Sequence, residues 1–335
     1  ASDVYKRQTL DRGNRSDDGV EIQSGATGNL IGGTVAGAGN LIAFNARDGV
    51  YLASGSGNTV LGNVIHSNSD LGIDLGTSGV TANDGNDIDS GSNNIQNFPV
   101  ITQADISGTD LTLSGTLDTD GLSTQYRIEF YGNAAGTTDA TNGEGRVYLG
   151  STTVTTDGNG DASFSSVTLN GVTLVVGDFV TATATRITDP GQVGIDDQLA
   201  YGDTSEFAAN FVISLANAVP VINSDGGGAA AAINVVENTT AVTTVTASDA
   251  DLDTLNYSIT GGADAAQFSI DNLTGALTFI AAPDFELPSD ANGDNVYEVT
   301  VQVADGNGGF DTQAISVTVT DVSSNLVVTT TADLS

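Results

Sequence analysis

Carboxylate side chains recur at the ends of predicted strands between Ile233 and Asn325. The runs Ala241–Ala247, Tyr297–Ala304 and Ala314–Thr320 are rich in Val, Ile and Thr and end at Asp, Gly or Asn, as half-buried antiparallel strands do. Ca²⁺ takes about six to eight hard oxygen ligands, and a rigid sheet can gather carboxylates from separate loops around one ion. The alternative is that Asp and Asn are ordinary turn residues and that each acidic end is merely solvated.

The order of these acidic motifs resembles that of the cadherin repeat, in the divergent form found in large bacterial surface proteins. The motifs that carry the resemblance are Glu237-Asn238, Asp249-Ala250-Asp251, Asp284-Phe285-Glu286, Asp305 and Asp321. The closing motif departs from the family, because Val322-Ser323-Ser324 precedes Asn325 where the family has an Asn-Asp pair. This end of the repeat therefore offers fewer ligands.

The resemblance implies a seven-stranded β-sandwich that binds Ca²⁺ at both of its poles. The ligands toward the next domain would be Glu237, Asp284, Glu286 and Asp321, and those toward the preceding domain would be Asp249, Asp251 and Asp305. The resemblance also implies a calcium-binding adhesion or spacer segment in which Ca²⁺ stiffens the domain junctions. Other cell-surface proteins, including further copies of the same protein, and polysaccharides are the expected partners.

Three loops have the alternating acidic spacing with which an EF-hand calcium loop begins. They are Asp157/Asn159/Asp161, Asp249/Asp251/Asp253 and Asp290/Asn292/Asp294. None is an EF-hand, because the bidentate acid at loop position twelve would be Thr168, Thr260 or Val301. The first loop is predicted to be a plain hairpin turn.

The charge of the chain is strongly acidic and unevenly distributed. The formal net charge is -34, all eight Lys and Arg lie at or before Arg186, and residues 187–335 hold 21 of the 42 acids. Such a surface repels nucleic acid and anionic lipid and attracts divalent cations. Solvation in a salty habitat is the alternative explanation. The composition fits both explanations and argues against nucleic acid as a partner.

The chain has few residues of the types that usually act in catalysis. It has no Cys, and its one histidine is His66, which argues against zinc sites and cysteine nucleophiles. His66 takes the place that Ala43 holds one repeat earlier, so an outward surface side chain is expected. We expect no enzymatic activity from this chain.

Pairs of carboxylates could in principle cleave a glycosidic bond, which makes a polysaccharide-binding or polysaccharide-cleaving protein the alternative function. The candidates lie near the last repeat and in the loop after it: Asp70, Asp74, Asp84, Asp87 and Asp89. Only Arg47 is nearby to steady an anionic substrate, and the chain has no Trp to stack on a sugar. A passive structural repeat without a ligand is a third interpretation.

Residues 18–68 contain an internal repeat. DGVEIQSGATGNLIGG (18–33) recurs as DGVYLASGSGNTVLGN (48–63), and GNLIAFN (39–45) recurs 23 residues later as GNVIHSN (62–68). Three short apolar pieces per period, separated by Gly and Asn, are typical of a stacked β-solenoid. The region resembles the last coils of a right-handed parallel β-helix. Stacked turns would then pair Asn40 with Asn63 and Asn45 with Asn68.

Residues 99–215 are predicted to form an immunoglobulin-like β-sandwich, because short strands alternate with turns. The predicted strands are Leu111–Leu117, Gln125–Tyr131, Arg146–Thr155, Ala162–Leu169, Phe179–Thr185 and Phe207–Ile213. The segment ITDPGQVGIDDQLAYGD (187–203) is interpreted as a long surface loop. Gly226–Gly228 and Ala229–Ala232 are expected to turn into the first strand of the next domain, with a flexible hinge as the alternative.

The predicted fold class is all-β, with the C-terminal coils of a right-handed parallel β-helix followed by two β-sandwiches. The predicted parts are an adapter-derived tail (1–8), β-helix coils (9–98), an Ig-like sandwich (99–215), a cadherin-like domain (216–325) and the start of a further domain (326–335). No run approaches the ~18–20 apolar residues of a membrane helix, so no membrane insertion is expected. The expected location is extracellular or on the outer cell surface, as an internal piece of a longer protein.

Overall fold

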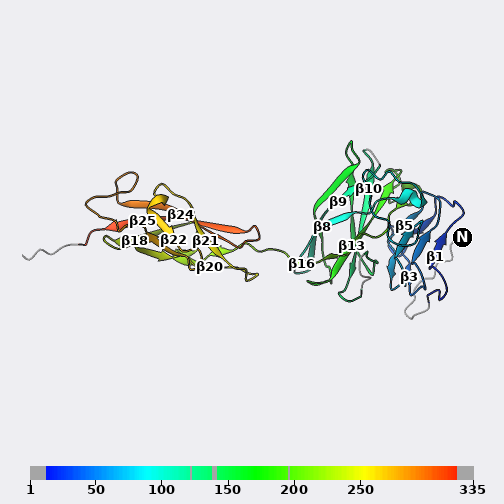
Figure 1. Cartoon of the computed structure of the whole chain (residues 1–335), viewed down its shortest axis with the longest axis horizontal. Coiled ribbons are helices and arrows are strands. Elements are labelled where there is room, and N and C mark those ends of the chain that lie inside the picture. The colour runs from blue at the N-terminus through cyan, green and yellow to red at the C-terminus, as the bar shows by residue number, and fades with distance from the viewer. Residues whose placement is uncertain (1–12, 121–122, 138–141, 195–196, 323–335) are drawn as a thin grey trace, which may run out of the picture. The chain divides into compact units, whose positions relative to one another are not determined.

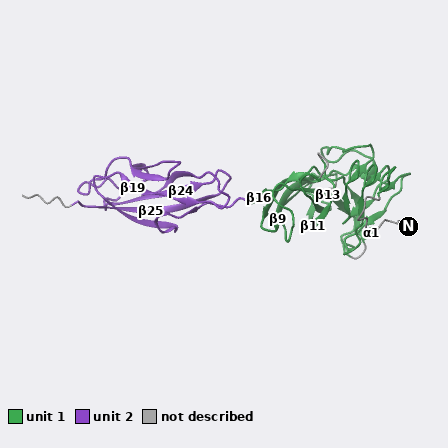
Figure 2. Ribbon diagram, turned by 90° about the horizontal axis from the view of Figure 1, so that it is seen from below, with its two compact units in different colours: residues 1–216 green, residues 217–335 purple. Residues whose placement is uncertain are grey.

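The chain is all-β and divides into two compact units, residues 1–216 and 217–335 (Figure 2). The computed structural model describes residues 13–120, 123–137, 142–194 and 197–322. The predicted tail (1–8) and the predicted start of a further domain (326–335) lie outside these ranges. Within the described ranges, no helix has the length and apolar character needed to cross a bilayer.

Seven three-residue strands open the first unit and pair in parallel (Figure 1). β1 (Val20–Ile22), β4 (Val50–Leu52) and β7 (Ile73–Leu75) form one sheet, β2 (Leu30–Gly32) pairs with β5 (Thr59–Leu61), and β3 (Leu41–Ala43) pairs with β6 (Val64–His66). Their inward side chains share one core: Ile22, Ile31, Ile42, Val50, Leu52, Val60, Ile65, Ile73 and Leu75. Each strand thus pairs with the strand one sequence repeat away, while the right-handed β-helix stays a prediction.

The predicted asparagine pairs at the turns are confirmed. The side-chain amide of Asn40 donates to Oδ1 of Asn63 at 3.0 Å, and that of Asn45 donates to Oδ1 of Asn68 at 2.7 Å. All four side chains are buried. Because a buried amide without a partner is costly, these pairs help to fix the register between successive repeats.

Two further sheets complete the first unit and enclose a second core. One sheet has the order β11-β10-β13-β14, with β15 also on β13, and the other has the order β12-β9-β8-β16. The strands are β8 (Val100–Ser107), β9 (Asp110–Asp118), β10 (Gln125–Asn133), β11 (Val147–Thr155), β12 (Asp161–Leu169), β13 (Phe179–Ile187), β14 (Tyr201–Thr204), β15 (Phe211–Val212) and β16 (Ser214–Leu215). Phe130 and Phe164 meet edge to face between the sheets, with ring centroids 5.4 Å apart. An immunoglobulin-like assignment stays a prediction.

The prediction was wrong around residues 187–213. A strand over Phe207–Ile213 is reduced to the two residues of β15, and the presumed surface loop contains α1 (Asp197–Ala200) and β14. Phe207 shows the cause. It is buried in the core of the opening strands, where its ring centroid lies 5.3 Å from that of Tyr131. Its hydrophobic character therefore reflects that core and not a strand of the sandwich. β8 was also not predicted.

Three buried glutamates join the two parts of the first unit. Glu129 accepts the backbone N–H of Gly62 at 2.8 Å, and Glu144 accepts that of Asn68 at 3.0 Å. Glu206 accepts two backbone N–H groups of the segment that contains β7 and the loop after it. The boundary predicted at residue 98/99 stays a prediction, but residues on its two sides pack into one unit.

The second unit has nine described strands, two more than the resemblance implies, because β17 and β20 pair as a short ladder of their own. The larger sheets have the orders β18-β25-β24-β21 and β19-β23-β22. The strands are β17 (Val221–Ile222), β18 (Ala230–Val236), β19 (Ala241–Thr244), β20 (Ala247–Ser248), β21 (Asn256–Gly261), β22 (Phe268–Ile270), β23 (Ala276–Phe279), β24 (Val296–Ala304) and β25 (Phe310–Thr320).

The strand predictions for this unit are confirmed in type and place. Tyr297–Ala304 and Ala314–Thr320 fall within β24 and β25, while Ala241–Ala247 is divided between β19 and β20. A turn at Ser224–Gly226 leads toward β18, but Ala230–Ala232, which were expected in the turn, already belong to this strand. The alternating residues of these strands face one core, in which Phe279 contacts both Phe268 and Tyr297. The strand ends that carry the acidic motifs are therefore held by a packed sandwich.

Candidate metal centres

The first acidic group contains Glu237, Asp284 and Glu286. One carboxylate oxygen of each lies within 4.8 Å of the others. Glu237 directly follows β18, is buried, and accepts the backbone N–H groups of Phe285 at 3.2 Å and Val322 at 3.0 Å. These two bonds fix its carboxylate beside the Asp284-Phe285-Glu286 motif.

The turn at Asp284 positions the third member of this group. Oδ1 of Asp284 accepts the backbone N–H of Glu286 at 3.0 Å, which presents the Glu286 side chain to solvent beside the other two acids. A hydrogen bond from its own backbone N–H lowers the pKa of Glu286. The Glu237 charge, partial desolvation, and the charges of Asp321 and Asp284 outweigh it, so the pKa is raised. Asp321 is therefore an electrostatic neighbour of the group.

The second acidic group contains Asp249, Asp251 and Asp253, again with one carboxylate oxygen of each within 4.8 Å of the others. Oδ1 of Asp249 accepts the backbone N–H groups of Asp251 at 2.8 Å and Asp253 at 3.3 Å. Oδ2 of Asp249 is buried and has no hydrogen-bond partner in the described chain. A buried carboxylate oxygen without a donor is a costly arrangement that a bound cation would relieve.

Asp305 lies next to the second group and is linked to it by hydrogen bonds. It follows β24, is buried, and its Oδ1 accepts the backbone N–H of Asn307 at 2.7 Å. The side chain of Asn307 in turn donates to Asp253 at 2.9 Å. The side-chain amide of Asn217 donates to Oδ2 of Asp305 at 2.8 Å and is the main reason that the pKa of Asp305 is lowered.

The structure thus places the seven predicted ligands in two separate sets. Glu237, Asp284 and Glu286 form one group with Asp321 nearby, and Asp249 and Asp251 form the other with Asp305 linked through Asn307. The ligand prediction omitted Asp253, although its alternate spacing after Asp249 and Asp251 was a visible signal. All of these ligands offer oxygen, and residues 217–322 contain no Lys, Arg or His. This donor set fits a hard divalent cation such as Ca²⁺.

A third group, Asp84, Asp87 and Asp89, lies in the first unit, in the loop that follows the repeats. Asp87 is buried, and both of its oxygens accept hydrogen bonds at 3.1 Å, from the Gln96 side chain and the Asn97 backbone. Burial raises the pKa of Asp87 to about 7, despite the Asn97 bond. Its carboxyl group is thus already satisfied by the protein.

His66 pairs with Ala43 across β3 and β6 and lies opposite the core-facing Ile65, as expected. Its side chain is nevertheless half-buried. Its ring packs edge to face on Phe44 at 5.8 Å, and Nδ1 lies 3.1 Å from the hydroxyl of Ser67. Burial, together with the charge of Arg146, lowers the pKa of His66 to about 4. The ring is therefore neutral at physiological pH.

The second unit is a β-sandwich with clustered acids at its strand ends. The family model described as Cadherin domain matches residues 231–320, which makes this unit a cadherin-like β-sandwich. A comparison with curated proteins found no match.

Solved structures similar to the chain include several cadherins. Human protocadherin-24 EC1-2 is 22% identical, with 31% of this chain and 46% of that chain covered and a TM-score of 0.25. Drosophila N-cadherin EC1-4 is 16% identical, with 68% and 50% covered and a TM-score of 0.28. Mouse cadherin-23 EC22-24 is 21% identical, with 67% and 65% covered and a TM-score of 0.28. The chain spans less than two thirds of each of these structures.

Proposed function

We propose that residues 217–322 bind Ca²⁺ at the two acidic groups and that the chain is an extracellular, calcium-stiffened adhesion or spacer segment of a larger surface protein. The observation that carries the proposal is the unpartnered, buried Oδ2 of Asp249, which lies in a group with Asp251 and Asp253. In this proposal the ligands are Glu237, Asp284, Glu286 and Asp321 at one site and Asp249, Asp251, Asp253 and Asp305 at the other.

Calcium would neutralise carboxylates that the loops of the sandwich bring together and that repel one another without the ion. At the second group the chain enters through Asn217 and Ala218, whose contacts are with Asp305 and Asp251. A cation bound by these acids would tie the entering chain to the loops after β20 and β24. It would therefore restrict motion of the chain where it enters the unit.

The proposal extends to the first unit as a part of the same bacterial surface protein. Its opening strands would be coils of a right-handed parallel β-helix, and its two sheets would be an immunoglobulin-like module. The parallel pairing of Val20 with Val50 and of Val50 with Ile73 supports stacked coils. In this proposal neither part carries out catalysis.

Calcium is expected to stabilise the second unit selectively. Scanning calorimetry of the full chain should show the unfolding transition of the second unit at a higher temperature in Ca²⁺ than in chelator. The transition of the first unit should stay at the same temperature. Mass action predicts a stabilisation of about 2.7 kcal/mol for each site at a free Ca²⁺ concentration a hundredfold above its dissociation constant. Mg²⁺ at equal concentration is the control, because its smaller octahedral shell fits such multi-carboxylate sites less well. Identical scans in Ca²⁺ and in chelator would exclude the calcium sites.

Adhesion and spacing can be separated by a bead assay. Beads coated with the full chain are expected to cluster in Ca²⁺ and to disperse in chelator if copies of the chain adhere to one another. Dispersed beads in Ca²⁺, together with a calcium-stabilised second unit, would limit the proposal to a spacer. The readout is the size distribution of the aggregates.

A further inference from the structure

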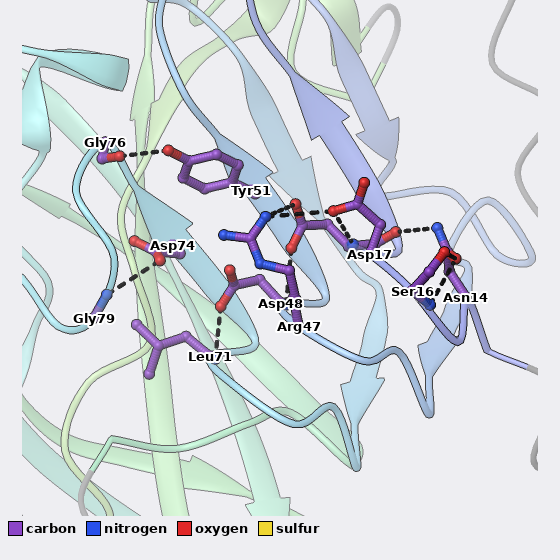
Figure 3. A network of polar contacts seen from close by, with 11 residues as sticks. Asn14, Ser16, Asp17, Arg47, Asp48, Tyr51, Leu71, Asp74, Gly76 and Gly79 are labelled. Carbon is purple, nitrogen blue, oxygen red and sulfur yellow. Dashed lines mark hydrogen bonds and ion pairs between the residues drawn. The ribbon is translucent and has the colours of Figure 1, made fainter.

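A short segment at the end of the repeats, Leu71–Thr81, is held down by buried carboxyl groups; we call it the 71–81 strap. It contains β7 and the loop after it. Oδ1 of Asp48 accepts the backbone N–H of Leu71 at 2.8 Å, and Oδ2 of Asp74 accepts that of Gly79 at 3.2 Å (Figure 3). Both aspartates are only 1% exposed. Their negative charge would therefore be poorly solvated.

A third carboxyl group holds the same strap from the sandwich. Glu206 is 2% exposed and accepts the backbone N–H groups of Leu75 and Thr81, each at 3.0 Å. Strap residue Asp74 also has a buried oxygen, Oδ1, without a hydrogen-bond partner in the described chain. The three carboxyl groups together accept four backbone N–H groups of the strap, and none of them forms an ion pair with a described Lys, Arg or His.

The charges that face these groups are mostly negative. Asp18 and Asp70 act on both Asp48 and Asp74, Asp74 also acts on Asp48, and both of these aspartates act on Glu206. Arg47 is the cation that faces Asp74, but its guanidinium is taken up by Asp17 at 3.3 Å and Asp18 at 3.5 Å and its side chain is 45% exposed. The surroundings therefore favour the protonated, neutral form of the buried acids.

The pKa values of these groups determine how the stability of the closed strap changes with pH. Burial, which outweighs the backbone hydrogen bonds, raises the pKa of Asp48 to about 7, of Asp74 to about 6 and of Glu206 to about 7. Unfolded Asp and Glu titrate near ~4, so the closed strap binds more protons than an opened one between about pH 4 and 7. The stability that these bound protons contribute is fully present below about pH 4. It is lost as the pH rises through the pKa values of the folded state.

We propose that the 71–81 strap is a proton-sensitive element that stays closed in acid, with its strand β7 paired to β4, and that opens locally as the pH rises. Tyr51, on the outward position of β4, donates its hydroxyl hydrogen to the carbonyl of Gly76 at 2.7 Å in the closed form (Figure 3). Opening would free this hydroxyl and expose Asp74. The device lies in the first unit and does not depend on calcium.

Hydrogen exchange of the full chain at pH 5 and pH 8 tests this proposal, with rates corrected for the intrinsic effect of pH. The backbone N–H groups of Leu71, Leu75, Gly79 and Thr81 are expected to lose at least tenfold of their protection at the higher pH. The N–H of Val317, in the central strand β25, is the internal control and should keep its protection. Unchanged protection of the strap across this range would overturn the proposal.

A charge-removing variant separates titration from other effects of pH. The double substitution Asp48→Asn with Asp74→Asn keeps an oxygen acceptor for the backbone N–H groups of Leu71 and Gly79 but cannot ionise. Protection at these two positions is expected to stay within a factor of three between pH 5 and pH 8. The single Asp74→Asn variant, which should lose part of the pH dependence, guards against misfolding of the double variant. A full pH dependence that persists in either variant would contradict the strap mechanism.

Discussion

Replacing Asp249 and Asp251 by asparagine is expected to remove the part of the second unit's calcium response that comes from the second acidic group. The substitutions keep an oxygen that can accept the N–H groups of Asp251, Asp253 and Ala218 but delete two of the three negative charges. At a Ca²⁺ concentration a hundredfold above the wild-type dissociation constant of this site, the variant should lose most of the roughly 2.7 kcal/mol that the ion bound there contributes. In chelator it should be at least as stable as the wild type, because repulsion is relieved.

The variant is expected to be less stable than the wild type in Ca²⁺ but at least as stable in chelator, and this contrast makes the test specific. A merely structural role for the acids would lower the midpoint of unfolding in both conditions, whereas ligand loss lowers it only in Ca²⁺. Asp225→Asn is the matched control, because this carboxylate accepts only the Thr243 hydroxyl, at 3.0 and 3.2 Å, and belongs to neither group. Its calcium response should equal that of the wild type. A double variant that responds to Ca²⁺ as fully as this control would remove the second site from the proposal.

The candidate ligands could be predicted because each follows a strand whose pattern is local. Val299, Val301 and Val303 alternate into the core of β24, so the strand ends where Asp305 begins the next turn. Asp253 was not among the predicted ligands because the resemblance extends only to the Asp249-Ala250-Asp251 motif. The hydrogen bond from Asn307 to Asp253 joins two loops 54 residues apart in the chain, which no local pattern encodes.

The buried glutamates of the first unit could not be predicted for a different physical reason. In β10 the residues Tyr126, Ile128 and Phe130 face the core, so the alternation places Glu129 on the outer face. That face is covered by the end of the repeats, and Glu129 is fully buried. The alternation within a strand shows only on which face of its own sheet a residue lies. Whether another segment covers that face depends on packing between distant parts of the chain.

Replacing Glu144 by alanine is expected to cause the largest loss of stability in the first unit. Its carboxylate is 3% exposed and accepts the backbone N–H groups of Ser67 and Asn68 and, at 2.9 Å, the side-chain amide of Asn68. The substitution leaves two buried donors of Asn68 and the half-buried N–H of Ser67 without this acceptor, and each such loss costs about 1–3 kcal/mol. Allowing for some entry of water, we expect the free energy of unfolding to fall by about 3–5 kcal/mol.

Because Asn68 is also the acceptor for Asn45, the effect should spread along the asparagine pairs into the preceding repeat. Calorimetry should therefore show a lower first-unit transition with the calcium-dependent transition unchanged. Glu144→Gln keeps one acceptor oxygen and should lose less, and exposed Glu21→Ala on β1 should change stability by no more than about 0.5 kcal/mol. A Glu144→Ala variant as stable as the Glu21→Ala control would mean that the sandwich does not hold the repeats through this carboxylate.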